Sequence, residues 1–431
     1  MGTRLGQAAS LLLTFSVILL CLVLGEGALR HWFPLDNVVL QADSRYLYKF
    51  IPNSRQLIRP LTASGAPTVL MTINSQGRRG ELLAKNKKRH IMVYGDSFVV
   101  AEGTPLKQTF VSQLADLLNA KAPQSVQVIN AGVPGYGPDQ ESLVMEDEID
   151  NVKPNLVVCA IYSGNDFGDL LRNKLFKPDE HQGLIPNHPT LDSNLVQGFK
   201  SALLQQPSFQ TIRRAKNLLA MARAPHRAAD NQYAKLSREL PKAWLIESQK
   251  EYVNGALEQD NQVHNLFLDG YDIDISTAPR SDSSRYKVAL MERMIVRIQS
   301  IAASRSIPLI FLIIPSPIDV LDKWDVSIDT SSFPEYRRSA LTGTLERIVK
   351  GHKFHYLNLF PSFRAHQVED LFYHGLDDHW NARGQRLAAM LMADYISQNE
   401  SLRTRTLRMN SAFEFEFLYN RVFFGKCKTI N

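Results

Sequence analysis

The 431-residue sequence predicts an α/β fold in which helices cover both faces of a parallel sheet. Apolar and amphipathic segments alternate along the chain between residues 90 and 396. The apolar segments are continuous hydrophobic runs, which is typical of strands that are buried on both faces. Polar residues suited to chemistry directly follow several of these runs, as expected at the carboxyl edge of a parallel sheet.

Each element is predicted from its own pattern. Runs rich in Val, Ile and Leu predict strands at residues 90–95, 126–130, 155–162, 307–314 and 354–360. Helical periodicity predicts helices at about 105–120, 138–150, 285–304, 335–350 and 382–396. Strand and helix thus alternate five times, which indicates βα units and a five-stranded parallel sheet.

The N-terminus carries a long uncharged segment, Ala8 to Gly25, which would extend over roughly 27 Å as a helix. It is longer than an ordinary signal-peptide core, and Gly25-Glu26-Gly27 is a poor cleavage site. We therefore favour an uncleaved signal anchor, with a cleaved signal peptide or a buried helix as alternatives. The positive-inside count does not decide the orientation. A short tail before a large domain favours an extracytoplasmic domain, periplasmic or extracellular.

Composition and charge argue against several classes of protein. A hydrophobic content of 44% and a charged content of 21% are those of an ordinary globular protein. The net charge is +6, but the basic residues are dispersed and form no nucleic-acid-binding motif, so we expect no nucleic-acid partner. Three cysteines do not make a disulfide framework. We expect neither a cofactor nor a metal ion.

The polar residues that follow the strands define a candidate site. Ser97 comes after the first predicted strand, Gly135 after the second, Asn165 after the third and His379 after the fifth. A serine hydroxyl becomes a nucleophile when a base such as His379 accepts its proton. A carboxylate must then orient the imidazole, and Asp377 and Asp378 both adjoin it in sequence. The Ser97 N–H, the Gly135 N–H and the Asn165 amide are candidate donors to an oxyanion.

These residues lie in four blocks, "GDSF" (95–98), "NAGVPGYG" (130–137), "SGND" (163–166) and "DDHWNARG" (377–384). In order and spacing the blocks resemble those of the SGNH/GDSL hydrolase superfamily, over about residues 75–170 and 285–398. The resemblance implies a flavodoxin-like three-layer α/β/α domain with Ser97 as nucleophile and His379 as base. It also implies that Gly135 and Asn165 stabilise the oxyanion. "INSQGRRG" (73–80) resembles a segment of membrane-anchored members, for which we expect a structural role.

One position departs from the family pattern. The usual last block is D-x-x-H, but Leu376 stands three residues before His379. Asp377 gives D-x-H instead, which resembles the branch that acetylates secreted polysaccharides and some anchored relatives. We favour Asp377 as the orienting carboxylate over Asp378, whose side chain we expect to point away.

We expect the following organisation: a transmembrane signal anchor (1–29), a lead-in segment (30–88), an SGNH hydrolase-like domain (89–398) and a basic, aromatic tail (399–431). Residues 168–283 lack a clean strand pattern and are expected to form a helical insertion that caps the site. Within it, Asp269, Asp272 and Asp274 are interpreted as a polar loop, with a cation site as the alternative.

The sequence therefore predicts a membrane-anchored serine enzyme that hydrolyses acyl esters, acetyl or short-chain, through an acyl-serine. Its substrate would be an acyl ester, with an acetylated glycan and a lipid as the candidates. An O-acetyltransferase for an envelope or secreted polysaccharide is the alternative, because it would use the same acyl-serine. A non-catalytic glycan-binding or assembly protein is a second alternative.

Overall fold

A central parallel sheet organises the structure, a computed structural model. It describes residues 2–32, 39–58, 65–84, 89–120, 126–179, 181, 183–204, 229–257, 260–266, 270–374, 377–399 and 402. The sheet has five strands: β5 (Arg89–Tyr94), β6 (Val126–Asn130), β7 (Leu156–Tyr162), β12 (Leu309–Ile314) and β13 (His355–Asn358). Their spatial order is β13-β12-β7-β5-β6, and every neighbouring pair is parallel. From the β6 edge this is the 2-1-3-4-5 order of a flavodoxin-like sheet, so the predicted fold class is confirmed.

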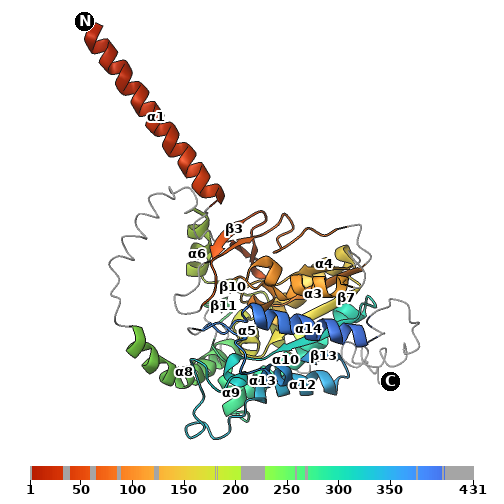
Figure 1. The fold of residues 1–431 in the computed structure, drawn as a ribbon. Coiled ribbons are helices and arrows are strands. Elements are labelled where there is room, and N and C mark those ends of the chain that lie inside the picture. The colour runs from red at the N-terminus through yellow and green to blue at the C-terminus, as the bar shows by residue number, and fades with distance from the viewer. Residues whose placement is uncertain are drawn as a thin grey trace, which may run out of the picture.

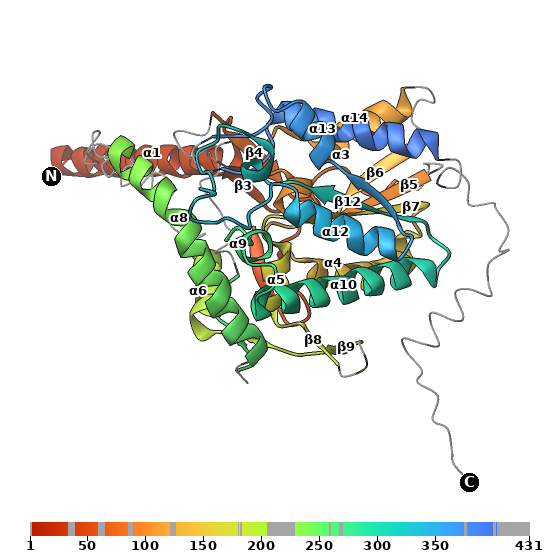
Figure 2. The same cartoon turned by 90° about the horizontal axis from the view of Figure 1, so that it is seen from below.

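Helices cover both faces of this sheet (Figures 1 and 2). One face carries α3 (Phe110–Asn119), α13 (Phe360–Ala365) and α14 (Ala382–Gln398). The other carries α4 (Pro138–Val152), α10 (Asp282–Ala303) and α12 (Ala340–Gly351). In β7, Val157 and Ile161 belong to one hydrophobic cluster, whereas Val158 and Ala160 belong to the other. All residues of β7 are buried, which explains why its sequence is a continuous apolar run.

The predicted helix at 335–350 begins later than expected, at Ala340. Tyr336 is buried, and its hydroxyl donates a hydrogen bond to the buried Asp319. This contact holds the preceding residues in turns rather than in the helix. Short helices after three strands were not predicted: α2 (Ser97–Val100), α5 (Asp166–Asn173) and α11 (Pro317–Val320).

The lead-in segment forms two antiparallel hairpins. β1 (Leu40–Asp43) pairs with β2 (Leu47–Phe50), and β3 (Arg55–Ile58) pairs with β4 (Val69–Thr72). Side chains from these hairpins, including Tyr48 and Met71, are fully buried in the same cluster as one face of the sheet. The lead-in therefore packs into the core of the domain.

The segment 168–283 contains helices and four short strands, which the sequence did not predict. Its elements are β8 (Phe176–Pro178), β9 (Leu184–Pro186), β10 (Thr190–Leu191), α6 (Ser193–Leu204), α8 (Ala229–Tyr252), η2 (Val253–Leu257), β11 (Gln262–Val263) and α9 (Ile273–Thr277). Asp272 and Asp274 do not form an exposed polar loop. Both are buried and paired with Lys287, whereas Asp269 lies outside the described residues. That this segment caps the site stays a prediction.

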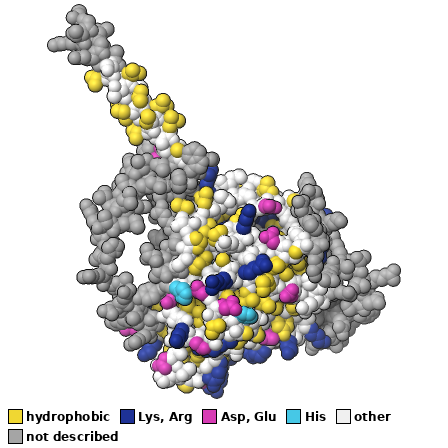
Figure 3. Space-filling view, viewed as in Figure 1, with side chains coloured by type: hydrophobic (Ala, Val, Ile, Leu, Met, Phe, Trp, Pro, Cys, Tyr) yellow, Lys and Arg dark blue, Asp and Glu magenta, His cyan; other side chains and the backbone are white. Residues whose placement is uncertain are grey.

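The N-terminal helix α1 (Gly2–Trp32) projects from the domain (Figure 1). Its stretch Ser10–Ala28 has a mean hydropathy of 2.3 and is only 6% buried. Apolar side chains cover this stretch in Figure 3. The buried-helix alternative is therefore wrong, and a signal sequence or an anchor fits the exposed apolar surface. The tail 399–431 lies outside the described residues except for Asn399 and Leu402.

The close approach of α2 and the segment that follows β6 gives a prediction about stability. A Cβ atom at Gly132 would lie 2.6 Å from the backbone nitrogen of Val100 and 2.8 Å from Cβ of Val99. We predict that Gly132→Ala lowers the free energy of unfolding by about 1–3 kcal/mol, because overpacking forces backbone shifts. Gly343→Ala in α12 is the control, because no atom lies within 4 Å of its added Cβ. It should raise that free energy by about 0.5–1 kcal/mol. Urea denaturation of both variants measures the free energy of unfolding. A Gly132→Ala variant as stable as the wild type would contradict this close packing.

Candidate active site

Ser97 begins the single helical turn α2, immediately beyond the end of β5. Asp96 precedes it as the N-cap, and its side-chain oxygen accepts a hydrogen bond of 2.9 Å from the Phe98 N–H. The Gly95 carbonyl accepts a hydrogen bond from the N–H of Val133, in the segment that follows β6. Ser97 is therefore held at the carboxyl edge of the sheet, where the sequence predicted it.

The carbonyls at the end of α2 are paired with buried side chains. Asn130 donates its amide to the Val99 carbonyl at 2.8 Å. The guanidinium of Arg79, which is 3% exposed, donates to the carbonyls of Val100 and Ala101, and to that of Thr104 at 2.6 Å. A helix end leaves its last carbonyls unpaired, so these donors stabilise a turn too short to be stable alone. Burial lowers the pKa of Arg79 to about 10, while the nearby carboxylate of Glu102 opposes this shift.

Phe98 brings the histidine loop to the serine. Its ring lies 5.0 Å from the ring of His379 and 5.1 Å from that of Trp380, measured between centroids. The ring centroid of Tyr162, the last residue of β7, lies 4.3 Å from that of Phe98. Phe98 is 1% exposed, so these contacts are part of the core. They place the imidazole beside the residue that follows Ser97.

The histidine is bound to two carboxylates. Nδ1 of His379 lies 2.8 Å from Oδ1 of Asp377 and 3.4 Å from Oδ1 of Asp378. Asp377 also accepts a hydrogen bond from the His379 backbone N–H at 3.2 Å. Asp377 therefore makes the shorter of the two contacts, and its role as the orienting carboxylate stays a prediction. The expectation that Asp378 points away is wrong, because the Tyr162 hydroxyl donates to its other oxygen at 2.6 Å and holds the carboxylate near the ring.

These carboxylates set the protonation of His379. Burial alone lowers the pKa of the imidazole, but the hydrogen bond to Asp377 and the charges of Asp378, Asp377 and Asp96 outweigh burial. The pKa rises from 6.5 to about 10. Glu102 lies within electrostatic range of the same ring, and burial raises its own pKa. The side chain of His379 is 39% exposed, so solvent can reach the imidazole.

The three candidate oxyanion donors are unpaired within the described part of the chain. The Ser97 N–H and the Gly135 N–H donate no hydrogen bond there, and Gly135 adopts a left-handed φ of +68°. The Asn165 side chain is also unbonded among these residues, although Asn165 is only 6% exposed and its Oδ1 is buried. The buried atom without a partner is the acceptor Oδ1; the NH2 group, which is the candidate donor, makes no hydrogen bond to the described residues.

The loop that carries Gly135 is fastened to the lead-in. Tyr48 donates its hydroxyl to the Pro134 carbonyl at 2.8 Å, and Tyr136 donates to the Tyr48 carbonyl at 2.6 Å. The two rings also pack edge to face, 5.3 Å apart. The lead-in hairpin thus fixes both sides of Gly135.

The Ser97 hydroxyl makes no hydrogen bond to the described residues, and its side chain is half-buried. Ser97 and His379 are thus brought to one edge through Phe98 without a direct bond between them. Catalytic hydrogen bonds are often long before substrate binds.

One group of side chains offers metal-ligand geometry among the described residues. Ligand atoms of Asp377, Asp378 and His379 lie within 4.8 Å of one another. Nδ1 of His379 is already engaged by Asp377, so an ion at this position would displace that hydrogen bond. A separate open depression lies elsewhere, between α5, α8 and β11, and is lined by residues that include Arg172, Glu251 and His264.

Several contributors to the site were missed from the sequence. Arg79 lies in the segment "INSQGRRG", for which only a structural role was expected, and Phe98 and Tyr162 were not singled out. Arg79 could have been found only from that segment's resemblance. Tyr162 shows no sequence signal, because its partner Asp378 is 216 positions away.

No family model and no curated protein matches the sequence. Solved structures do match. The acetyl xylan esterase AlAXEase is 12% identical over 71% of this chain and 99% of that chain, with a TM-score of 0.35. A lipase/acylhydrolase from Enterococcus faecalis is 13% identical over 72% of this chain and 96% of its own, with a TM-score of 0.34. A putative lipolytic protein of the G-D-S-L family from Desulfitobacterium hafniense is 9% identical over 71% and 99%, with a TM-score of 0.31. Identities and TM-scores this low carry no argument about activity.

The fold itself can be assigned from the topology. The flavodoxin-like strand order and the layers of helices are those that the four sequence blocks imply. The chain has a flavodoxin-like three-layer α/β/α fold, as the resemblance to the SGNH/GDSL hydrolases implies. Within it, the serine, glycine and asparagine blocks directly follow the strands β5, β6 and β7, and the histidine block precedes α14.

The two carboxylates at His379 give a prediction about its titration. Because the folded pKa is raised, their stabilisation of the imidazolium is complete below pH 6.5 and is lost as the pH rises through about 10. We predict that Asp378→Asn lowers the pKa of His379, since one negative charge is removed. NMR titration of the imidazole measures this. Asp370→Asn is the matched control, because Asp370 pairs with His374 at 3.2 Å and should leave His379 unchanged. Equal His379 titrations in wild type and Asp378→Asn would contradict the assigned contact.

Proposed function

We propose that this protein is a serine-dependent ester hydrolase that forms an acyl-serine at Ser97. The observation that carries the proposal is the set of unpaired donors at the carboxyl edge of the sheet. The Ser97 N–H, the Gly135 N–H and the Asn165 amide make no hydrogen bond within the described residues. An oxyanion that forms in the transition state requires such donors.

In the proposed reaction the neutral form of His379 acts: its Nε2 accepts the proton of the Ser97 hydroxyl while Oγ attacks the ester carbonyl carbon. The carbonyl oxygen becomes an oxyanion that the three donors stabilise. The C–O bond to the alcohol then breaks, and the imidazolium returns the proton to the departing oxygen. Water, deprotonated by the same imidazole, attacks the acyl-serine and releases the carboxylic acid and free Ser97. Asp377 holds the ring through Nδ1, so that Nε2 is free for these transfers.

We further propose that α1 anchors the enzyme in a membrane and that the domain lies on the extracytoplasmic side. The exposed apolar stretch Ser10–Ala28 supports an anchor, since its 19 residues are about as long as a bilayer core requires. The acyl group would be acetyl or short-chain, and the alcohol partner a glycan or lipid within reach of the membrane surface.

The second candidate is O-acetyl transfer to a polysaccharide. It is favoured by the contact of His379 with a carboxylate two residues before it, at 2.8 Å, because this is the D-x-H arrangement of the polysaccharide-acetylating branch. In that reaction a sugar hydroxyl replaces water in the attack on the acyl-serine.

The nucleophile gives the first prediction of this proposal. A fluorophosphonate probe should label the wild-type protein at Ser97 and should not label Ser97→Ala. Hydrolysis of p-nitrophenyl acetate should fall at least about 10⁴-fold, as when the nucleophile of other serine enzymes is removed. Ser331→Ala, in an exposed loop, is the control and should behave as wild type. Equal labelling of Ser97→Ala and wild type would instead favour a non-catalytic glycan-binding protein.

Acceptor dependence separates the two reactions. The full-length protein in detergent is incubated with p-nitrophenyl acetate, with and without unacetylated xylan, mannan and alginate oligosaccharides. If the protein is a hydrolase, acetate is released at the same rate with and without the oligosaccharides, and the oligosaccharides do not gain mass. An acetylated oligosaccharide that Ser97→Ala does not form would replace hydrolysis by transfer as the proposed reaction.

A further inference from the structure

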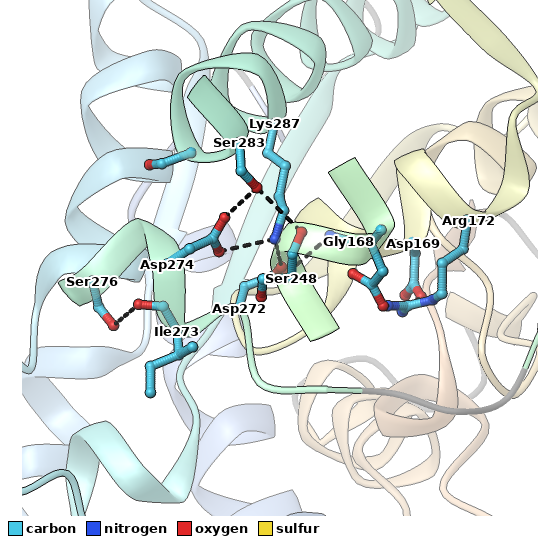
Figure 4. A network of polar contacts seen from close by, with 12 residues as sticks. Gly168, Asp169, Arg172, Ser248, Asp272, Ile273, Asp274, Ser276, Ser283 and Lys287 are labelled. Carbon is cyan, nitrogen blue, oxygen red and sulfur yellow. Dashed lines mark hydrogen bonds and ion pairs between the residues drawn. The ribbon is translucent and has the colours of Figure 1, made fainter. Parts of the chain in front are cut away.

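A fully buried ion-pair network links α10 to the segment around α9 and lies close to Gly168 of α5 (Figure 4). Lys287, on α10, has a side chain that is 0% exposed. Its Nζ lies 2.7 Å from Oδ1 of Asp272 and 2.9 Å from Oδ1 of Asp274. A buried ammonium is tolerated only with paired carboxylates, so the three side chains form one unit. None of them takes part in the proposed chemistry.

Asp272 connects this unit to the turn that carries Asn165. Its backbone N–H donates to the Gly164 carbonyl at 2.7 Å. Its Oδ2, the oxygen turned away from Lys287, accepts from the Gly168 N–H at 3.0 Å. Gly164 precedes Asn165, and Gly168 lies in the first turn of α5, which Asn165 caps. Asp272 thus bonds to the chain on both sides of Asn165.

The Asn165 side chain gives the turn no support, so the turn is held by other groups, among them the Asp166 carboxylate, which accepts from the Tyr162 N–H at 2.8 Å. An N-cap side chain usually accepts a hydrogen bond from the first turn of its helix, but the Asn165 side chain makes no capping bond. Among the described residues, only its backbone carbonyl is engaged, by the N–H groups of Gly168 and Asp169 at 2.9 and 3.0 Å. The amide is therefore left for the substrate, and Asp272 completes the hydrogen bonding of the turn.

We propose that Asp272, oriented by Lys287, is a positioning residue that aims the Asn165 amide at the oxyanion. This inference rests on the proposed function and extends it to the insertion, since Asp272 lies between residues 168 and 283. Oxyanion donors act only if they are preorganised, and a misplacement of about 1 Å can cost on the order of 100-fold in rate.

The network contains its own matched control. Asp274 binds the same ammonium and is as deeply buried as Asp272. Its second oxygen accepts from the Ser283 hydroxyl at 2.6 Å, within the α9–α10 pair, and not from the Asn165 turn. Asp272→Asn and Asp274→Asn therefore remove the same charge from the same cation, but only the first disturbs the turn.

The test measures kcat and KM for p-nitrophenyl acetate in the full-length protein and in Asp272→Asn, Asp274→Asn, Asn165→Ala and Asp272→Asn/Asn165→Ala. We expect Asp272→Asn to lower kcat about tenfold or more with little change in KM, and Asp274→Asn to keep kcat within about twofold. In the Asn165→Ala background, Asp272→Asn should cost less than about twofold, because both changes act through one amide. A purely structural role would lower the melting temperature equally in both aspartate variants. The effects of Asp272→Asn and Asn165→Ala on kcat would then combine independently in the double variant.

A kcat for Asp272→Asn equal to that of Asp274→Asn would overturn the inference. Should Asp272→Asn fail to fold, Asp272→Asn/Lys287→Gln is measured in its place against Asp274→Asn/Lys287→Gln, because each of these variants leaves one buried carboxylate without the cation. Hydrogen exchange of residues 163–170 gives a readout independent of activity, and it should be faster in Asp272→Asn than in Asp274→Asn. If Ser97→Ala and Asn165→Ala retain activity, the proposed function fails. If Ser97→Ala and Asn165→Ala lose activity but Asp272→Asn retains it, only the proposed role of Asp272 fails.

Discussion

The packing of Phe98 is the contact on which the candidate site depends. This one ring touches Tyr162 at the end of β7, and His379 and Trp380 ahead of α14. Aromatic pairs of this kind are each worth about 0.5–1.5 kcal/mol beyond the area that they bury. Because Phe98 follows Ser97 directly, the core contact and the position of the nucleophile are set by the same turn. The site is thus an extension of the hydrophobic core that lies between the sheet, α3 and α14.

Around this contact, each segment of the site is fixed by a different part of the chain. Arg79 comes from the lead-in and satisfies carbonyls that α2 leaves unpaired. Tyr48, also from the lead-in, fastens the Gly135 loop. Asp272 supports the Asn165 turn from the insertion. The polar atoms proposed to meet substrate are free because backbone and remote side chains supply the bonds that hold their turns in place. The proposed donors are therefore held in place and still have no partner among the described residues, as preorganised oxyanion donors require.

The sequence was sufficient for the fold because its central strands β7 and β12 are continuous apolar runs in which every residue is buried. β6 was predicted at its exact bounds, and β7 to within one residue, since a strand buried on both faces has no other pattern. The short turns after the strands were missed, because their stability comes from contacts such as Arg79 with Val100 rather than from local propensity. The prediction of a polar loop at Asp272 and Asp274 was wrong for the same reason, because their burial depends on a contact with a residue that is distant in sequence. Three nearby aspartates resemble a polar loop until Lys287, distant in sequence, is placed among them. Asp378 was misjudged because its orientation depends on Tyr162, which is equally remote.

The most direct test of the account is a crystal structure of the protein after reaction with a monoethylphosphonate. The account predicts a covalent bond from Oγ of Ser97 to phosphorus. It also predicts that one phosphoryl oxygen lies about 2.7–3.1 Å from the Ser97 nitrogen, the Gly135 nitrogen and the Asn165 amide nitrogen. Nε2 of His379 should face the same phosphorus centre. An adduct whose phosphoryl oxygen points away from Gly135 and Asn165, or an unmodified Ser97 after exhaustive treatment, would contradict the account.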